Sequence, residues 1–364
     1  MNGVVFLHIG TRKSGTTSLQ GLLRGSTAAL AEQSVALRAT PHGMTQVIAD
    51  LASGRRELQE EAVGRLVRVL EFGPERQIIS LEALAELPQW LASQIVAAVQ
   101  GLGYEVKVVI TARHWGLAVP SEWQQTVKER GTATLQEYIA ATRHGGPGEP
   151  GFWACHYLPD IVSRWSERTD DVVVIATPSP PVDGPGIVDL FCAEVGIDPS
   201  TLSKPPGEAV ANRSLSLGQA EMVRRLNLEL SRRQVPKRPF YRKAVRGWIV
   251  RESLMADNGR TPVRLPAEAA PWCVEVTRRQ LVELRRSSVR IVGDEADLLC
   301  PEDLAVGPIQ PNDRDVLDVA LGAMAELAIQ RWKTVAERDM TVGRPEKPGA
   351  RVRRLRTAVR RRIL

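Results

Sequence analysis

A glycine loop near the N-terminus has the residues best suited to hold an anion. Residues 10–17 (GTRKSGTT) follow a short apolar run, Val4–Ile9, and lead into a helical pattern over Thr16–Leu30. The backbone N–H groups of such a loop and the positive end of the following helix point at one place. Lys13 adds a full positive charge there. The other residues predicted to line this site are Ser14, Gly15, Thr16, Thr17 and Ser18.

The lysine of this loop does not lie where a Walker A loop has it. Gly10 and Gly15 have the Walker spacing, but Thr16 occupies the position of the Walker lysine, and the lysine has moved to Lys13. A glycine-turned loop that only begins a helix is the structural alternative. The run Lys-Ser-Gly-Thr-Thr-Ser directly after a buried strand favours phosphate binding.

These residues resemble the 5′-phosphosulfate loop of sulfotransferases, whose core is Lys-x-Gly-Thr-Thr/Ser. The resemblance implies that the donor is 3′-phosphoadenosine 5′-phosphosulfate (PAPS) and that Lys13 bridges to the leaving phosphate. It also implies that the whole segment from Arg12 to Ser18 belongs to the donor site. The family more often has Pro where this chain has Arg12, a departure that leaves the Lys-x-Gly-Thr-Thr run intact.

Arg113 is a candidate for a second phosphate contact. It follows the apolar run Val106–Thr111, and Ser121 comes eight residues later. Alone, Arg113 is typical of a solvated strand end, and Ser121-x-x-Gln124 is a capping-box pattern that makes Ser121 a helix N-cap. Together they resemble the 3′-phosphate motif of sulfotransferases. Because ligands of parallel sheets bind beyond the carboxyl ends of the strands, we expect Arg113 to lie near the glycine loop.

Glu82 is the candidate general base. Transfer to a hydroxyl requires a group that accepts the acceptor's proton. The resemblance implies a His or Glu just after the second strand, and Glu82 directly follows Ile78–Leu81. The alternative is an acid in the first turn of a helix, which the helix dipole favours. The rival bases are His114, close to Arg113, and His8, within the first strand, whereas His156 looks incidental.

The resemblance to sulfotransferases, especially those of actinobacteria, covers roughly residues 1–235. It includes the stretches VVITARHWGLAVPSEWQQTVKERGTATLQEYI, FWACHYLPDIVSRW and NRSLSLGQAEMVRRLN, with a fainter similarity at Ile291–Leu298. Arg213 lies within the third stretch and is as readily a surface charge as a phosphate contact. No pair of acids with a Mg²⁺-like spacing follows a strand, so no metal is predicted.

Short apolar runs alternate with helical patterns along the chain. The runs are Val4–Ile9, Ile78–Leu81, Val106–Thr111, Val172–Ala176 and Val289–Val292. Buried, non-alternating strands separated by helices predict a parallel sheet covered on both faces. We therefore expect an α/β, P-loop-like three-layer sandwich with helical C-terminal additions. Residues 1–340 form one predicted domain, with an unassigned insertion at 236–271, a helical part at 272–340 and a basic tail at 341–364.

The composition is that of a globular protein. The 364 residues are 43% hydrophobic and 25% charged, no apolar run approaches the length of a membrane span, and the N-terminus is typical of a strand. A cytoplasmic protein with four free cysteines is therefore expected. Residues 344–364 hold nine Lys and Arg against one Glu, a net charge of +8, so the rest of the chain carries −2. The positive charge thus does not indicate a nucleic-acid-binding fold.

The sequence leaves the acceptor and the tail open. The expected acceptor is a hydroxyl or amine of an unidentified small molecule, glycan or lipid, and variable loops would bind it. The basic tail is either a disordered solubilising segment or a contact with an anionic surface. A small-molecule kinase and a non-catalytic nucleotide-binding protein of the same fold are the alternative functions.

Overall fold

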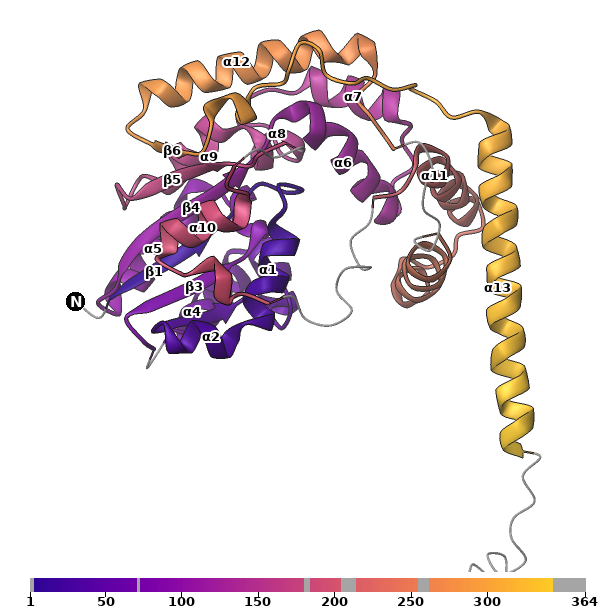
Figure 1. Ribbon diagram of the computed structural model, residues 1–364, viewed down its shortest axis with the longest axis horizontal. Coiled ribbons are helices and arrows are strands. Elements are labelled where there is room, and N and C mark those ends of the chain that lie inside the picture. Colours follow the sequence, from indigo (N-terminus) through magenta and orange to yellow (C-terminus); the bar gives the residue numbers. More distant parts are fainter. Residues whose placement is uncertain (1–2, 71–72, 180–183, 204–213, 255–261, 343–364) are drawn as a thin grey trace, which may run out of the picture.

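The computed structural model describes residues 3–70, 73–179, 184–203, 214–254 and 262–342. These residues form one six-stranded sheet in which every neighbouring pair is parallel, with strand order β2-β3-β1-β4-β5-β6 (Figure 1). The strands are β1 (Val4–His8), β2 (Val35–Ala39), β3 (Arg76–Ser80), β4 (Glu105–Ala112), β5 (Val172–Ala176) and β6 (Arg290–Val292). The chain is therefore an α/β protein with a central parallel sheet, as the sequence predicts.

Strand β2 is the one strand of this sheet that the sequence does not predict. It lies at the edge and pairs only with β3. Its three central side chains are partly exposed, and one of them is Arg38, whose Nε donates a hydrogen bond to Gln77 Oε1 (2.6 Å). Because Arg38 interrupts this five-residue edge strand, the segment has no continuous apolar run. A search for buried strands by such runs therefore does not identify it.

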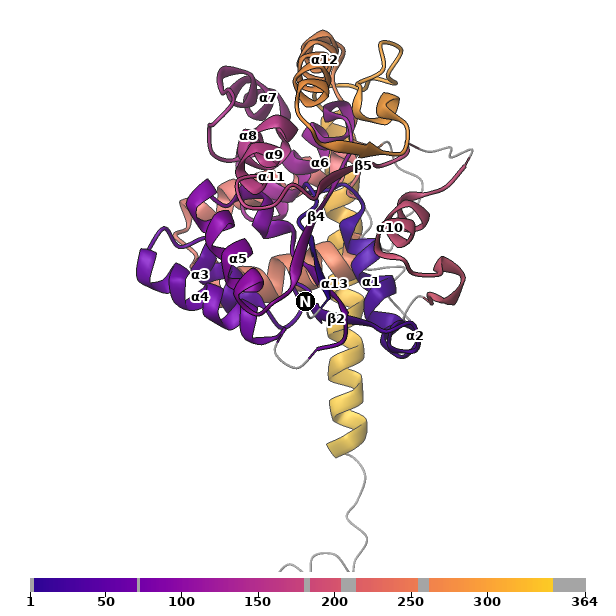
Figure 2. The ribbon, with the colours of Figure 1, turned by 90° about the vertical axis from the view of Figure 1, so that its left-hand side faces the viewer.

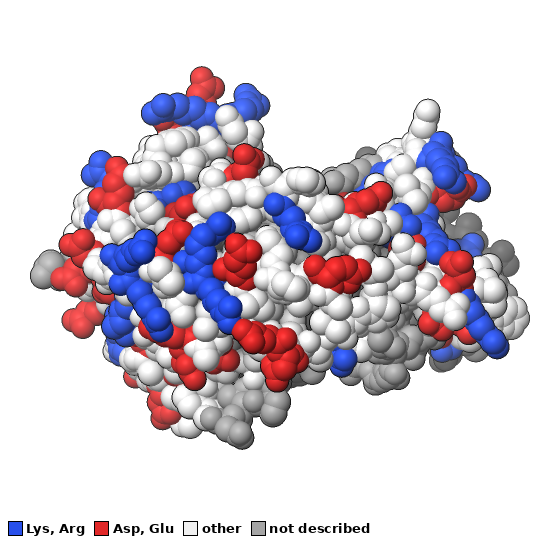
Figure 3. Space-filling model, turned by 90° about the horizontal axis from the view of Figure 1, so that it is seen from above, with Lys and Arg blue, Asp and Glu red and all other residues white. Residues whose placement is uncertain are grey.

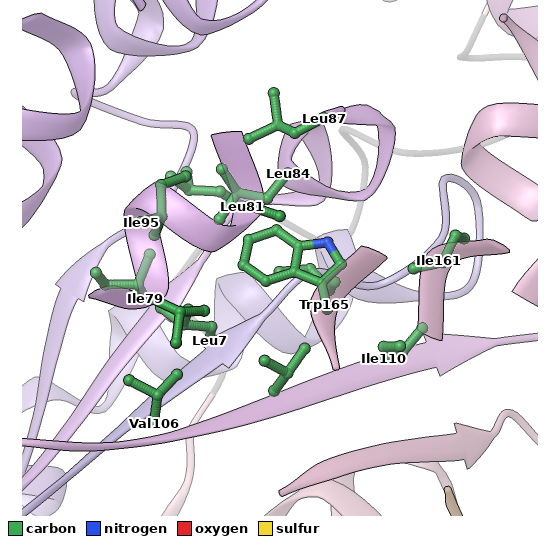
Figure 4. Packing of buried hydrophobic residues seen from close by; sticks show 14 of the residues in the cluster. Leu7, Ile79, Leu81, Leu84, Leu87, Ile95, Val106, Ile110, Ile161 and Trp165 are labelled. Atoms are coloured by element: carbon green, nitrogen blue, oxygen red, sulfur yellow. The ribbon is translucent and has the colours of Figure 1, made fainter. Parts of the chain in front are cut away.

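Alternate side chains of the strands supply two separate hydrophobic cores. Leu7 and Ile110 belong to the core on one face, whereas Phe6 and Val109 belong to the core on the other. Figure 4 shows the first of these cores, in which the indole of Trp165 packs among aliphatic side chains of the sheet and of the neighbouring helices. Burial on both faces explains why the strands are continuously apolar.

Helices cover both faces of the sheet (Figure 2). One face packs against α3 (Thr45–Leu51), α4 (Arg56–Arg68), α5 (Gln89–Gly101), α9 (Leu158–Trp165) and α12 (Ala270–Arg286). The other packs against α1 (Thr16–Gly25), α2 (Thr27–Glu32) and α10 (Ile187–Val195). This arrangement is consistent with a three-layer sandwich.

The predicted helix over Thr16–Leu30 is two helices, so that prediction is wrong in extent. The chain breaks at Ser26, between α1 and α2. The Ser26 hydroxyl accepts a hydrogen bond from the backbone N–H of Ser203 (2.8 Å). A serine hydroxyl committed to a distant backbone group favours such a break, and spacing along the sequence does not reveal it.

A second group of helices, outside the sheet layers, forms its own hydrophobic core around Trp115. The ring of Trp115 packs edge-on against those of Phe152 and Trp153, with 4.9 Å between ring centroids in each pair. Its helices are α6 (Trp115–Lys128), α7 (Leu135–His144), α8 (Phe152–His156), α11 (Leu217–Arg232), η4 (Lys237–Leu254) and α13 (Asp313–Val342). The unassigned insertion is thus partly helical. The Tyr241 hydroxyl of η4 donates to Asn227 Oδ1 (2.8 Å), which fixes η4 on α11.

The C-terminal part, 272–340, is largely helical and also supplies strand β6 to the sheet, within the apolar run Val289–Val292 that the sequence predicts as a strand. Short helical turns connect the larger elements: η1 (Glu82–Glu86), η2 (Pro199–Thr201), η5 (Ala267–Ala269) and η6 (Glu295–Leu298). All four cysteines are buried and free. Arg213 and the predicted tail from residue 343 onward lie outside the described residues.

Two further expectations from the sequence concern the charge of the surface and the presence of membrane-spanning helices. On the face shown in Figure 3, positive and negative side chains are interspersed, as the near-neutral charge outside the tail implies. None of the helices in the described part of the chain is long and apolar enough to cross a bilayer.

Candidate active site

The sheet topology brings the ends of three neighbouring strands together. Strand β1 lies between β3 and β4, and all three run in the same direction. Beyond the strands, the Thr11 N–H donates to the Thr111 carbonyl (2.8 Å) and the Leu81 N–H donates to the His8 carbonyl (2.9 Å). The glycine loop, Glu82 and the start of α6 therefore emerge at one edge, where ligands of parallel sheets bind.

The loop has a backbone that requires glycine at two positions. A Cβ on Gly10 would lie 2.0 Å from Thr111 Oγ1, so no side chain fits there. Gly15 has a φ of 88°, and Lys13 is also left-handed, with a φ of 63°. Gly15 is the N-cap of α1, and no side chain in the described part of the chain caps that helix end. The Ser18 N–H donates to the Gly15 carbonyl (3.1 Å), so the N–H groups that a ligand or solvent can meet are those before it, of Thr16 and Thr17.

Among residues 14–18 of the loop, two hydroxyl-bearing side chains are buried and two are exposed. The Ser14 hydroxyl is buried, donates to the Thr11 carbonyl (2.7 Å) and lies 3.1 Å from Thr111 Oγ1. Thr16 is buried as well, whereas Thr17 and Ser18 are exposed. Ser14 therefore stabilises the loop, and the hydroxyls that a bound anion can reach are those of Thr17 and Ser18.

Arg113 and Ser121 lie in direct contact. Arg113 Nη2 donates to Ser121 Oγ at 2.7 Å and to the Leu117 carbonyl at 3.2 Å. Its buried Nε has no hydrogen-bond partner, and no carboxylate of the described residues lies within ion-pair distance. Burial lowers the pKa of Arg113 to about 10, and Glu122 partly opposes that shift. The guanidinium is therefore a partly buried cation without a direct counter-ion in the described protein.

Ser121 is not a helix N-cap, so the structural alternative for this residue is wrong. Helix α6 begins at Trp115 and continues through Pro120, which makes Ser121 an interior residue. The predicted capping partner, Gln124, instead accepts a hydrogen bond from the Leu215 N–H (2.9 Å). Proline usually marks the first turn of a helix, which is why the sequence suggests a later start.

Glu82 is the first residue of η1 and is partly buried beside the loop. Burial raises the pKa of its carboxyl to about 7, while the charge of Lys13 and then that of Arg12 limit the rise. A carboxylate and an ammonium group thus face the same edge of the sheet. Their proximity permits proton transfer at Glu82 and charge stabilisation at Lys13 within one site.

Arg12 is already engaged by carboxylates, which its place in the loop did not predict. It pairs with Glu86 at the end of η1, and its Nη1 lies 3.9 Å from Glu122 on α6. His156 Nε2 lies 3.8 Å from the other oxygen of Glu122, too far for a hydrogen bond, and burial lowers the pKa of this imidazole. Burial tends to raise the pKa of Glu122, but His156 and Arg12 hold it below its ordinary value.

These ion pairs join three elements of the site. The side chain of Glu122 is only 4% exposed, and it follows directly after Ser121. Arg12 therefore connects the glycine loop to η1, which carries Glu82, and to α6, which carries Ser121. Glu86 and Glu122 were missed in the sequence, because an ion pair between separate elements has no spacing that reveals it.

His8 and His114, the two rival bases, differ in their hydrogen-bond partners. His8 Nδ1 lies 2.7 Å from Ser80 Oγ and its Nε2 lies 3.0 Å from Thr111 Oγ1, and burial lowers the pKa of the ring to about 3. His8 is thus a packed, neutral core residue. Burial, followed by the charge of Arg113, lowers the pKa of His114 to about 4, and its buried Nδ1 has no partner in the described residues.

A hollow of about 630 Å³ opens beside Glu86. Its walls are the segment after η1, the loop before α8, and α9, with Asp160, Ser163 and Arg164 among the lining residues. Arg164 Nη2 donates to the carbonyls of Ala85 (2.7 Å) and Ala154 (2.6 Å), which fixes the wall. The hollow therefore adjoins the end of the turn that Glu82 begins.

In the described part of the chain, no group of three or more His, Cys, Asp or Glu side chains is placed to hold a metal ion. Comparisons of the chain with protein-family models, with curated proteins and with solved structures give no match.

Proposed function

We propose that this chain is a sulfotransferase that moves a sulfuryl group from PAPS to a hydroxyl or amine of an acceptor. The observation that carries the proposal is the 2.7 Å contact between Arg113 and Ser121, at the sheet edge where the Lys13 loop lies. A guanidinium and a hydroxyl side by side suit the oxygens of one phosphate group. The unpartnered, buried Nε of Arg113 is the group that such a phosphate would satisfy.

The loop supplies the second anion site that this donor requires. The uncapped start of α1, the left-handed backbone at Lys13 and Gly15, and the exposed hydroxyls of Thr17 and Ser18 suit a 5′-phosphosulfate. We propose a P-loop-like role for this segment on these grounds. The two sites lie on neighbouring strands, β1 and β4, as a nucleotide with phosphates at both ends of its ribose would need.

The proposed reaction divides the chemistry between two residues. The bound donor supplies an activated sulfuryl group. Glu82 accepts the proton of the acceptor hydroxyl as its oxygen bonds to sulfur, and Lys13 offsets the negative charge on the phosphate oxygen as the sulfur–oxygen bond breaks. We propose the hollow beside Glu86 as the acceptor site, because it adjoins the turn that Glu82 begins. Its mixed polar lining suits a polyhydroxyl or other polar acceptor.

Binding calorimetry with Arg113→Ala tests the proposal. Wild-type protein should bind 3′,5′-adenosine bisphosphate with micromolar affinity without Mg²⁺. Arg113→Ala should weaken that binding by about 2–4 kcal/mol, because a charge-assisted bidentate contact is lost, and should leave AMP binding nearly unchanged. Arg56→Ala, in an exposed pair with Glu60, is the matched control and should change neither.

Three results would contradict the proposal. Equal losses for the bisphosphate and AMP would mean that Arg113 does not contact the 3′-phosphate. A preference for ATP with Mg²⁺ would indicate a kinase. Absence of binding by either nucleotide would indicate a protein that has the fold without the activity.

A further inference from the structure

The end of α6 carries a lysine on the same side of the helix as Ser121. Ser121, Gln125 and Lys128 follow one another at intervals of four and three residues, so they share one side of α6. Ser121 is the residue of that side that contacts Arg113, at 2.7 Å. Figure 1 shows α6 running from the sheet toward α11. Lys128 therefore lies about 10 Å beyond Ser121 along the helix axis.

Helix η4 packs beside this end of α6. Tyr241 Oη of η4 lies 3.1 Å from the carbonyl oxygen of Val127, the residue before Lys128. Arg130, just beyond α6, donates from Nη2 to the Val235 carbonyl (2.6 Å), and its guanidinium carbon lies 5.8 Å from the centroid of the Tyr241 ring. These contacts hold η4 next to Lys128.

A row of arginines runs along η4 at the edge of its covered side. That side is marked by the buried residues Tyr241, Val245 and Val250. An arginine directly follows each of them, and these arginines are Arg242, Arg246 and Arg251. Because the three buried residues share one side of the helix, the residues that follow them share one flank. All three arginines are exposed.

Three cations from different elements act on one another at this place. Burial lowers the pKa of Lys128 to about 8, and the positive charges of Lys13 and then Arg246 contribute to the shift. The charge of Lys13 also acts on Glu82, so the group of cations adjoins the proposed base. Bringing like charges together is unfavourable without an anion between them, and such a group is typical of a site that binds one.

We propose that Lys128 and Arg246 bind an anionic group of the acceptor, a carboxylate or a phosphate, at a distance from the hydroxyl or amine that reacts beside Glu82. This inference rests on the proposed function and adds the charge of the acceptor to it. The two anionic ends of the donor have their own sites, at Arg113 and at the start of α1, so an anion site beyond them suits the acceptor. The hollow beside Glu86 and these cations would then hold different parts of one acceptor. The exposed arginine row extends the positive charge into solvent, where it attracts an anionic acceptor.

Calorimetry with sugars of different charge tests the inference. The chain is first saturated with 3′,5′-adenosine bisphosphate at low ionic strength, and glucose, glucuronate and glucose 6-phosphate are then titrated separately. These probes share one kind of ring and differ in carrying no acid group, a carboxylate or a phosphate. The wild-type chain should bind both acids more tightly than glucose, and the tighter of the two identifies the preferred anion.

Variants of two lysines provide the matched comparison. Lys128→Met should weaken the binding of both acids by about tenfold, because a charge-assisted contact is lost, and Lys128→Arg should retain it. Lys128→Met should bind the bisphosphate as wild type does, which also shows that this variant is folded. Lys243→Met is the control, because this exposed lysine of η4 lies outside the arginine row, with its ammonium 5.9 Å from the centroid of the Trp248 ring. It should bind both acids as wild type does.

Three results would overturn the inference. A chain that binds the bisphosphate but binds neither acid more tightly than glucose would have no site for an anionic acceptor. Equal losses in Lys128→Met and Lys243→Met would indicate a general attraction to positive surface. Loss of bisphosphate affinity in Lys128→Met would assign Lys128 to the donor instead. Failure of the proposed function is a separate result, because it appears in the first titration as absent bisphosphate binding, and it would remove this inference with it.

Discussion

The carboxyl group of Glu82 connects the proposed chemistry to pH at the scale of single residues. Burial raises its pKa to about 7, and Lys13 opposes the shift. A base with a pKa near neutrality suits proton transfer at physiological pH. Glu82→Gln should bind the bisphosphate as wild type does but lose turnover by roughly 10²–10⁴-fold. Lys13→Ala should lose both affinity and turnover, because it removes a charge from the donor site itself.

The same Glu82→Gln variant should be more stable than wild type in a defined pH window. The carboxyl ionises near pH 4.5 in the unfolded chain and near pH 7 in the folded one, so folding penalises its charged form. The wild-type free energy of unfolding therefore falls as pH rises from 4.5 to 7. Glu82→Gln removes that loss. Its melting temperature should exceed that of wild type at pH 8 and equal it near pH 4.5.

Thermal melts at the two pH values, together with turnover at saturating donor, check the Glu82 prediction. Near-normal turnover in Glu82→Gln would remove Glu82 from the mechanism and direct the search to His114. Equal melting temperatures at pH 8 would show that folding does not penalise the charged carboxylate. A residue that costs stability while it supports activity is a common sign of a functional role.

The sequence predicts which residue types gather at the site but not how each is used. The resemblance to the 3′-phosphate motif of sulfotransferases predicted Arg113 and Ser121 as partners, and they lie in contact. Ser14 was predicted to contact the donor, yet its hydroxyl turns inward to the Thr11 carbonyl. Lys13, the residue before it, has a left-handed backbone, and the spacing of residue types carries no information about such a conformation.

At the scale of secondary-structure elements, Arg12 is the residue that holds the loop, η1 and α6 in register. Arg12→Met should leave the nearly buried carboxylate of Glu122 without its arginine and cost about 1–2 kcal/mol of stability, less than a fully buried pair, because the Arg12 side chain is 40% exposed. Adding Glu122→Gln should recover part of that loss, because the two side chains interact directly. The bisphosphate affinity of Arg12→Met should fall, and the double variant should regain part of it.

A double-mutant cycle of unfolding and of bisphosphate binding measures this coupling. Arg56→Met, which breaks an exposed pair with Glu60, is the control and should change stability by less than about 1 kcal/mol. If Arg12 instead contacts the donor directly, Arg12→Met should lose affinity with little loss of stability. Glu122→Gln would then restore neither.

Elements with strong apolar periodicity were predictable, and those set by distant contacts were not. Strands β4 and β5 gave apolar runs because helices bury both of their faces. The edge strand β2 and the break at Ser26 depend on partners far away in sequence, Gln77 and Ser203. The start of α6 was placed too late, because a proline inside a helix is indistinguishable by sequence from one that begins it.

At the scale of the whole molecule, the sheet and the C-terminal helices share elements, so we expect them to unfold together. Strand β6 comes from the C-terminal part and pairs with β5. Helix α12 contributes Leu284 to the core beneath the sheet and Cys273 to the core around Trp115. A helix that is buried in two cores at once couples their stabilities, since neither core survives its loss intact.

Calorimetry of the full chain, with and without 3′,5′-adenosine bisphosphate, tests this coupling. A single unfolding transition is expected. At about a hundredfold excess of bisphosphate over its dissociation constant, the folded state gains about 2.7 kcal/mol, and the whole transition shifts upward. A chain that ends at residue 342 should behave alike, because every proposed donor residue precedes that point. Two transitions, of which the ligand shifts only one, would divide residues 1–340 into independent units, since a ligand stabilises only the unit that binds it.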